Sequence, residues 1–309
     1  MNEAQPIVDC WFLSGATAVG KTQVALSLAR RIGAEIISLD SMAVYRGMDI
    51  GTAKPTPEEQ AQVLHHLIDV VDPSEEFSIE RYLELAQEAV AEIRSRGHEV
   101  LFVGGTPLYL KALLRGLSSG PPADWKVREQ IAAEVEEVGN EVLHQRLEQL
   151  DPLAASQIHP HDTRRLIRAL EVFRATGEPI SHQQSHFDEG TPADECRVFV
   201  LRRSREEQHE RINERVEQML ERGLIDEVKR LTSEGKTLGR TASQAVGYRE
   251  VIDYLADDDY DSMVAKIKAR TRRFAKRQGT WFRSLCECRF VNIEGDADAE
   301  EVSEQIAAV

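Results

Sequence analysis

The first third of the chain alternates short apolar runs with segments of helical periodicity. The apolar runs lie at residues 7–13, 35–39 and 100–103. Apolar residues recur at helical spacing over 21–32 and over 79–96, and Gly97 follows the second of these segments. Buried parallel strands read as continuous apolar runs, and their alternation with helices is typical of a parallel sheet covered by helices. The pattern therefore predicts an α/β core.

The pattern changes after Gly120, where two prolines follow in succession. From residue 121 to about 187 the apolar positions recur only at helical spacing. Asp162 or Thr163 is an N-cap type of residue, and Gly177 is a C-cap type. We therefore expect a small all-helical insert at 121–190, between one part of the core at 1–120 and a second at 191–309.

The last third predicts a return to the sheet followed by helices. An apolar run at 197–201 predicts a further strand. Helical patterns follow at 205–222, 224–233 and 244–255, and then in a basic segment up to residue 283. The segment 293–309 is acidic, and we expect it to be peripheral.

Residues 15–22 read GATAVGKT, which matches the G-x-x-x-x-G-K-[ST] pattern of a P-loop. An apolar run precedes the match and a helical pattern follows it, which is the context that this motif requires. Backbone N–H groups of such a loop bind phosphate oxygens, Lys21 adds a positive charge, and the Thr22 hydroxyl is placed to hold Mg²⁺. The core is therefore expected to be P-loop NTPase-like and to bind a polyphosphate.

Two further polar clusters follow strands of the predicted sheet. Asp40 and Ser41 end the second apolar run, and Gly104-Gly105-Thr106 ends the third. Ligands of such sheets bind beyond the carboxyl ends of the strands, so the three clusters should meet in one crevice. Asp40 could accept a proton or orient the water shell of a metal there, or it could simply form an Asx turn.

Composition adds two constraints. The 309 residues are 41% hydrophobic, no run is long enough to span a membrane, and the four cysteines lack zinc spacing, which fits a reducing cytoplasm. The net charge of −15 argues against a polyanionic partner, yet residues 262–283 hold eight Lys or Arg and no acid. That run is either a nucleic-acid contact or a solvated helix face.

Six blocks of sequence together resemble one family. They are DSMAVYRGMDIGTAKP (40–55), HHLID (65–69), VGGTPLYLKALLRG (103–116), RRLIRALEV (164–172), QAVGYRE (244–250) and RRFAKRQGTWFR (272–283). With the P-loop, they resemble the tRNA dimethylallyltransferases, the bacterial isopentenyl-tRNA transferase family, over nearly the whole chain. Ala16, Val19 and Pro107 depart from the usual pattern, and none of them removes a charge or hydroxyl that the chemistry needs.

The resemblance implies a reaction. A dimethylallyl group passes from dimethylallyl diphosphate to N6 of adenosine 37, next to the anticodon of tRNA, and pyrophosphate leaves. The target base must be flipped out of its stack to be reached. Asp40, Thr106 and Lys21 are implied as catalytic residues, Mg²⁺ on Thr22 as the cofactor, and a cytoplasmic monomer as the state of the enzyme, with no membrane partner.

The resemblance also implies two binding sets. The diphosphate set is Gly15, Ala16, Thr17, Ala18, Val19, Gly20, Lys21, Thr22, Arg211 and Arg215. The set that contacts the tRNA anticodon stem-loop is Asp40, Ser41, Met42, Ala43, Thr106, Arg128, Arg164, Arg165, Leu166, Ile167, Arg168, Gln244, Ala245, Val246, Gly247, Tyr248, Arg249, Lys276, Arg277 and Arg283.

Two other functions compete with this one. A small-molecule kinase, or an isopentenyltransferase acting on free adenine nucleotides, would need the P-loop but neither the helical insert nor the basic helix. A non-catalytic RNA-binding protein would need the basic helix but not an intact Lys21, Thr22 and Asp40.

Overall fold

The computed structural model describes residues 6–117, 120–183, 190–233 and 237–309. The chain divides into two compact units. The described residues of Ile7–Leu114 and Gly190–Val309 form an α/β unit, and those of Met1–Pro6 and Arg115–Glu189 belong to a helical unit.

The α/β unit is built on a six-stranded sheet in which every neighbouring pair is parallel. Its strands are β1 (Trp11–Gly15), β2 (Ala34–Ser38), β3 (His65–His66), β4 (Glu99–Gly104), β5 (Val198–Arg202) and β6 (Arg289–Asn292), in the order β3-β2-β4-β1-β5-β6. The predicted fold class and four of the strands are confirmed. The sequence pattern missed β3 and β6, the two short edge strands.

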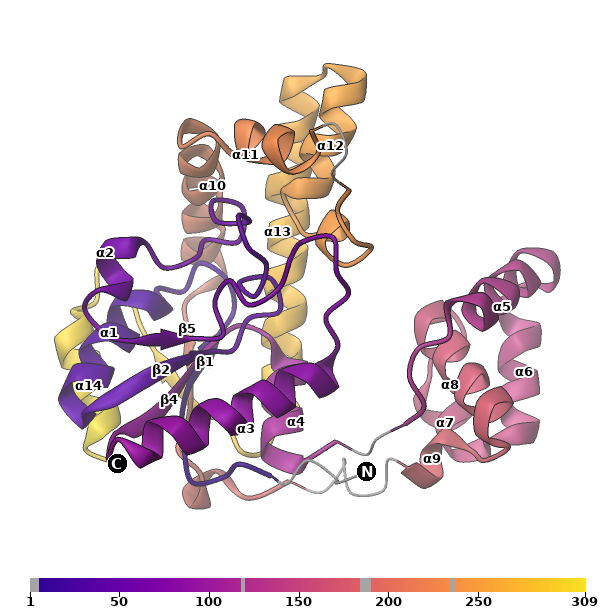
Figure 1. Cartoon of the computed structure of the whole chain (residues 1–309), viewed down its shortest axis with the longest axis horizontal. Coiled ribbons are helices and arrows are strands. Elements are labelled where there is room, and N and C mark those ends of the chain that lie inside the picture. The colour runs from indigo at the N-terminus through magenta and orange to yellow at the C-terminus, as the bar shows by residue number, and fades with distance from the viewer. Residues whose placement is uncertain (1–5, 118–119, 184–189, 234–236) are drawn as a thin grey trace. The chain divides into compact units, whose positions relative to one another are not determined.

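Helices surround this sheet (Figure 1). They are α1 (Lys21–Ile32), α2 (Pro57–Gln60), α3 (Ile79–Ser95), α4 (Pro107–Arg115), α10 (Arg205–Glu221), α11 (Leu224–Leu231), α12 (Tyr248–Asp257), α13 (Tyr260–Arg283) and α14 (Ala299–Ala307). The β1–α1–β2 crossover moves toward one edge of the sheet and the β3–α3–β4 crossover moves back. Because such crossovers are right-handed, α1 and α3 must cover opposite faces.

The expectation that the acidic tail is peripheral is wrong. Within it, α14 packs along α1 (Figure 1), and Val302 and Ile306 belong to the hydrophobic core beneath the sheet. The Ser303 and Ser27 hydroxyls, both buried, form a 2.6 Å hydrogen bond between the two helices. The acidic residues of the tail had obscured these apolar positions, which recur at helical spacing.

The helical unit contains α5 (Trp125–Val138), α6 (Asn140–Leu150), α7 (Pro152–Gln157), α8 (Thr163–Thr176) and α9 (Ile180–Gln183). It has its own hydrophobic core, which includes Ile131, Leu143, Leu147 and Leu170. The Asp162 side chain caps the N-terminus of α8, and Gly177 ends that helix with a φ of 73°. In the described residues of both units, no helix combines the length and the apolar character needed to cross a bilayer.

A buried carboxylate fixes the amino end of the sheet. Glu35 on β2 accepts two hydrogen bonds from Arg96, at 2.9 and 2.7 Å, and one each from His66 and His98 at 2.7 Å. The hydrogen bonds from Arg96 are the main cause that lowers the pKa of Glu35 to about 2. This arrangement links β2, β3 and the start of β4.

This network predicts an acid-dependent loss of stability. The folded pKa of Glu35 lies below its unfolded value of 4.5. The contribution of this carboxylate to the free energy of unfolding is therefore complete above pH 4.5 and is lost as pH falls toward 2. The shift corresponds to about 3 kcal/mol. Urea unfolding should therefore show Glu35→Gln less stable than wild type at pH 7, with a difference that is about 1 kcal/mol smaller at pH 3.5.

Glu92→Gln is the matched control, because Glu92 is an exposed partner of the same arginine. It should change the free energy of unfolding by less than about 1 kcal/mol at either pH. A difference for Glu35→Gln that stays constant between the two pH values would contradict the assignment.

Candidate active site

The three polar clusters predicted from the sequence lie at one edge of the sheet. They follow β1, β2 and β4, which are neighbouring parallel strands. From β1 the chain runs to β2 on one side, and from β4 it goes on, through the helical unit, to β5 on the other. Such a switch in direction between adjacent strands is where open α/β sheets bind ligands.

Three carbonyl groups of the 15–22 loop, those of residues 17–19, accept hydrogen bonds from α10 and the residues just before it. Gln208 Nε2 donates to Thr17 O at 3.0 Å, and Arg211 Nε donates to Ala18 O at 3.2 Å. Arg203, just before α10, donates from Nε to Val19 O at 3.0 Å. Gln208, Arg211 and Arg215 recur at helical spacing, so one face of α10 lies along the loop.

With its carbonyls held outward, the loop presents its N–H groups on the other side. Within the described residues, the N–H groups of Ala18, Val19 and Gly20 donate to no protein acceptor. Ala18 and Gly20 have positive φ values of 65° and 99°, which form the tight turn before α1. Unpaired amides beside a helix N-terminus form an anion-binding cradle.

Half-buried positive charge lies beside this cradle. Lys21 Nζ donates to Gly15 O and Ala16 O, both at 2.9 Å, and Arg215 Nη1 lies 3.5 Å from Thr17 Oγ1. Burial, reinforced by Arg215, lowers the pKa of Lys21 to about 8, although Asp40 raises it; burial and Arg211 lower the pKa of Arg215. In the part of the chain that the structure describes, no carboxylate forms an ion pair with Lys21, Arg211 or Arg215.

Partly desolvated cations without acidic partners are destabilising, and a bound anion offsets that cost. The arrangement therefore suits a highly charged anion such as a diphosphate. The Thr22 hydroxyl makes no hydrogen bond to the described residues, so it is available to a cation. Mg²⁺ commonly uses one or two protein oxygens together with phosphate oxygens, and Thr22 fits that pattern.

Asp40 and Thr106 meet next to the cradle. Asp40 Oδ1 accepts from Met42 N at 2.8 Å and from Ala43 N at 3.3 Å, so the expected Asx turn exists. Its Oδ2 has no partner among the described residues and remains available for chemistry. Thr106 Oγ1 accepts from Ser41 N at 3.1 Å, which joins the loop after β4 to the loop after β2.

Gln278 on α13 was missed from the sequence and is central to the site. Its Oε1 accepts from Thr17 N at 2.9 Å, and its Nε2 donates to Gly105 O at 2.5 Å. The side chain is buried, with 4% exposed. A signal was available, because Gln278 lies on the buried face of α13 in register with Ala275 and Phe282, where a polar residue is unexpected.

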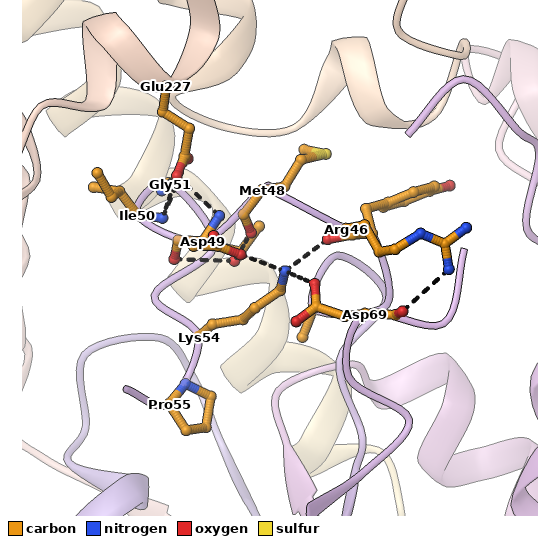
Figure 2. Close-up of polar contacts among 12 residues, drawn as sticks. Arg46, Met48, Asp49, Ile50, Gly51, Lys54, Pro55, Asp69 and Glu227 are labelled. Carbon is orange, nitrogen blue, oxygen red and sulfur yellow. Dashed lines mark hydrogen bonds and ion pairs between the residues drawn. The ribbon is translucent and has the colours of Figure 1, made fainter. Parts of the chain in front are cut away.

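Glu227 on α11 was also missed. Its buried carboxylate accepts from Asp49 N at 3.0 Å, Ile50 N at 2.9 Å and Gly51 N at 3.2 Å, and from the Tyr248 hydroxyl at 2.5 Å. Figure 2 shows the carboxylate pointing at this turn of backbone. A Cβ on Gly51 would lie 2.4 Å from the Tyr248 ring, so no larger residue fits there.

A buried lysine braces the other side of the same segment (Figure 2). Lys54 Nζ donates to Tyr45 O at 2.6 Å and pairs with Asp49 at 2.7 Å and Asp69 at 2.5 Å. Asp69 N in turn donates to Ala43 O at 3.1 Å. The loop that starts at Asp40 is therefore fixed by charged contacts along its length.

Several residues of the expected RNA-binding set have buried side chains. Those of Ala43, Leu166, Ala245 and Tyr248 are 5%, 0%, 8% and 0% exposed, so these side chains pack within the protein. Leu166 lies in the core of the helical unit, and Tyr248 binds Glu227. Arg249, between buried neighbours, is exposed.

Two arginines of the helical unit are tied together by one acid. Glu171, 1% exposed, binds Arg128 Nε at 3.0 Å and Arg168 Nη1 at 2.7 Å. The Arg128 guanidinium also stacks on Trp125. Arg165 is exposed beside Asp162, Arg164 is exposed, and Ile167 is half-buried against the core.

The eight cations of α13 divide into two groups. Lys268 pairs with Glu217, Arg270 with Glu250, and Arg272 bonds to Asn213, so these three hold α13 to α10 and α12. The exposed remainder are Lys266, Arg273, Lys276, Arg277 and Arg283. The basic run is therefore partly structural and partly available to a polyanion.

The sheet, the loop and its unpaired cations together define a P-loop-like α/β protein built around an anion cradle. Comparison with known proteins gives the family. The family model described as IPP transferase matches residues 43–285. The tRNA dimethylallyltransferase of Rhodopirellula baltica is 48% identical over 91% of this chain and 87% of its own length, and that of Thermotoga maritima is 46% identical over 95% of each.

Solved structures agree with this relationship. The tRNA isopentenylpyrophosphate transferase of Bacillus halodurans matches with a TM-score of 0.69 and 40% identity, over 98% of this chain and 96% of that one. A eukaryotic dimethylallyltransferase acting on tRNA matches with a TM-score of 0.77 and 28% identity, over 96% of this chain and 77% of that one. The chain belongs to the tRNA dimethylallyltransferase family, and it is a prenyltransferase.

The lowered pKa of Lys21 predicts how anion binding depends on pH. A bound anion favours the charged ammonium, so affinity should fall as pH rises through about 8 and Lys21 loses its proton. Calorimetric titration with inorganic pyrophosphate should show that wild type loses about tenfold or more in affinity between pH 7 and pH 9.5, beyond any change that Lys21→Met shows over the same range. That variant should bind weakly at both values. An equal pH response in the two proteins would remove Lys21 from the site.

Proposed function

We propose that this enzyme transfers the dimethylallyl group of dimethylallyl diphosphate to N6 of adenosine 37, next to the anticodon of tRNA. The observation that carries the proposal is the cluster of Lys21, Arg211 and Arg215, half-buried cations without acidic partners in the described residues, beside the unpaired amides of the loop. A diphosphate satisfies both. Asp40 and Thr106 lie on the neighbouring strand ends, where an acceptor would meet the donor.

The proposed chemistry is a displacement at the allylic carbon. The bond from that carbon to the diphosphate oxygen breaks, and its electron pair leaves with pyrophosphate. The loop amides, Lys21 and the two arginines stabilise the negative charge that develops there. Mg²⁺ held by the Thr22 hydroxyl and by diphosphate oxygens would supply further positive charge at the leaving group.

The acceptor amine loses a proton as it forms the new carbon–nitrogen bond. Asp40 receives this proton through Oδ2, while Oδ1 keeps its hydrogen bonds to Met42 and Ala43. Thr106 keeps Ser41 and Asp40 in place. Because adenine must leave its stack to reach these groups, the reaction includes base flipping.

The proposed RNA contacts are the loop from Asp40 to Met42, the exposed Arg249, the exposed cations of α13 and the arginines of α8. Charge and exposure support the basic residues, and the position of Asp40 beside the cradle supports the loop. We further propose that the enzyme acts as a cytoplasmic monomer. All four cysteines are free, which suits a reducing compartment.

The test is to incubate the enzyme with dimethylallyl diphosphate, Mg²⁺ and either an anticodon stem-loop or AMP, and to analyse the nucleosides by mass spectrometry. The stem-loop should gain an N6-dimethylallyl group. Asp40→Asn should melt like wild type, since asparagine keeps the Asx turn, but should react about 10²–10⁴-fold more slowly. Prenylation of AMP alone would favour the free-nucleotide function, and an unchanged rate would remove Asp40 as the base.

The exposed cations of α13 predict salt-sensitive RNA binding. The affinity for the stem-loop should fall linearly on a log–log plot against salt, and Lys276→Ala should reduce that slope by about 1. Arg30→Ala is the control, because Arg30 is an exposed cation of α1 paired with Glu300. Its slope should match wild type. A slope for Lys276→Ala equal to that of Arg30→Ala would mean that this face does not contact phosphate.

A further inference from the structure

We infer that Gln278 is a positioning residue that fixes the distance between the diphosphate loop and the loop that holds the acceptor. The inference rests on the proposed function, because it assigns the donor to one loop and the acceptor to the other. It goes beyond that function by giving a role to a neutral side chain of the basic helix.

The primary amide of Gln278 uses both of its ends. Oε1 accepts from Thr17 N in the diphosphate loop, and Nε2 donates to Gly105 O in the loop after β4. Methionine or leucine can do neither, glutamate cannot donate, and asparagine is too short to span the gap. The bridge therefore depends on the length and the chemistry of glutamine.

The packing around Gly105 makes this bridge tight. A Cβ on Gly105 would lie 2.7 Å from Gln278 Nε2, 3.2 Å from Gly15 O and 3.6 Å from Lys21 Nζ. The backbone of the second loop is thus pressed against the glutamine amide and against the first loop at once. Only a glycine allows this approach.

The Gln278 bridge is connected to the proposed base, Asp40, through the backbone and one hydrogen bond. Gly105 precedes Thr106, whose hydroxyl binds Ser41 N, and Ser41 follows Asp40. A shift of Gly105 would therefore move Asp40 relative to the diphosphate. A misplacement of about 1 Å between reacting groups can slow a reaction about 10²-fold.

The diphosphate loop has other supports. Thr17 is also held by Gln208 through its carbonyl and lies beside Arg215 through its hydroxyl. Removal of the Gln278 amide should therefore leave the anion cradle in place and loosen the link to the acceptor side. This predicts a loss in the rate of chemistry without a matching loss in donor binding.

The experiment compares Gln278→Met, which keeps length and loses both polar ends, with wild type and with Ser303→Ala. Ser303 also makes a buried hydrogen bond between two elements, but at the far helix pair α1–α14. Three quantities are measured: the melting temperature, pyrophosphate affinity, and the single-turnover rate with a stem-loop at saturating donor.

We expect Gln278→Met to lose 10–100-fold in single-turnover rate, with pyrophosphate affinity changed less than about threefold. Ser303→Ala should lower the melting temperature and leave the rate unchanged. Gln278→Glu keeps the acceptor for Thr17 and lacks the donor for Gly105, so its rate at saturating donor should also fall at least tenfold. It replaces the methionine variant if that one does not fold.

Two results would overturn the inference. One is a wild-type rate in either Gln278 variant. The other is a loss of pyrophosphate affinity in Gln278→Met as large as the loss of rate, which would mean that the residue only supports the first loop. Failure of the proposed function would look different, because wild type itself would then leave the stem-loop unprenylated.

Discussion

The active site depends on the direction in which one short loop turns its peptide groups. Gln208, Arg211 and Arg203 hold the carbonyls of Thr17, Ala18 and Val19 on the side of α10. The N–H groups are consequently left facing the crevice, and Arg211, which holds one of the carbonyls and has no acidic partner among the described residues, also brings positive charge to it. The contacts of α10 with the loop thus shape the cradle and place a positive charge beside it.

The remaining framework serves to keep the acceptor side in register with this loop. Glu227 and Lys54 fix the segment that follows Asp40 from two sides, and Thr106 joins it to the loop after β4. These groups are charged or polar, Glu227 and Lys54 are buried and Thr106 is half-buried, and each has its partners. A buried network with every member satisfied holds one geometry, whereas a purely apolar contact would tolerate sliding. Catalysis by positioning needs such rigidity.

Much of this was predictable from the sequence. Continuous apolar runs predicted the central strands, and the position of three polar clusters after those runs predicted their meeting at one edge. The two edge strands were not predictable, since two and four residues carry too little pattern. Gln278 and Glu227 act through contacts with residues more than 170 positions away, and periodicity holds no information about such partners. Tyr248 and Leu166 are buried, whereas residues next to them in the sequence are exposed. A sequence motif does not distinguish the two kinds of residue.

The two groups of cations on α13 have a consequence for how a nucleic acid approaches. The chain carries a net charge of −15, so its surface as a whole repels a polyanion. Three of the α13 cations form ion pairs or hydrogen bonds with acids and an amide of the protein itself. The five exposed cations leave a narrow strip of positive charge. Repulsion elsewhere and attraction along this strip would orient an incoming RNA during its encounter. The acidity of the chain therefore disfavours encounter complexes in which the RNA approaches any other face.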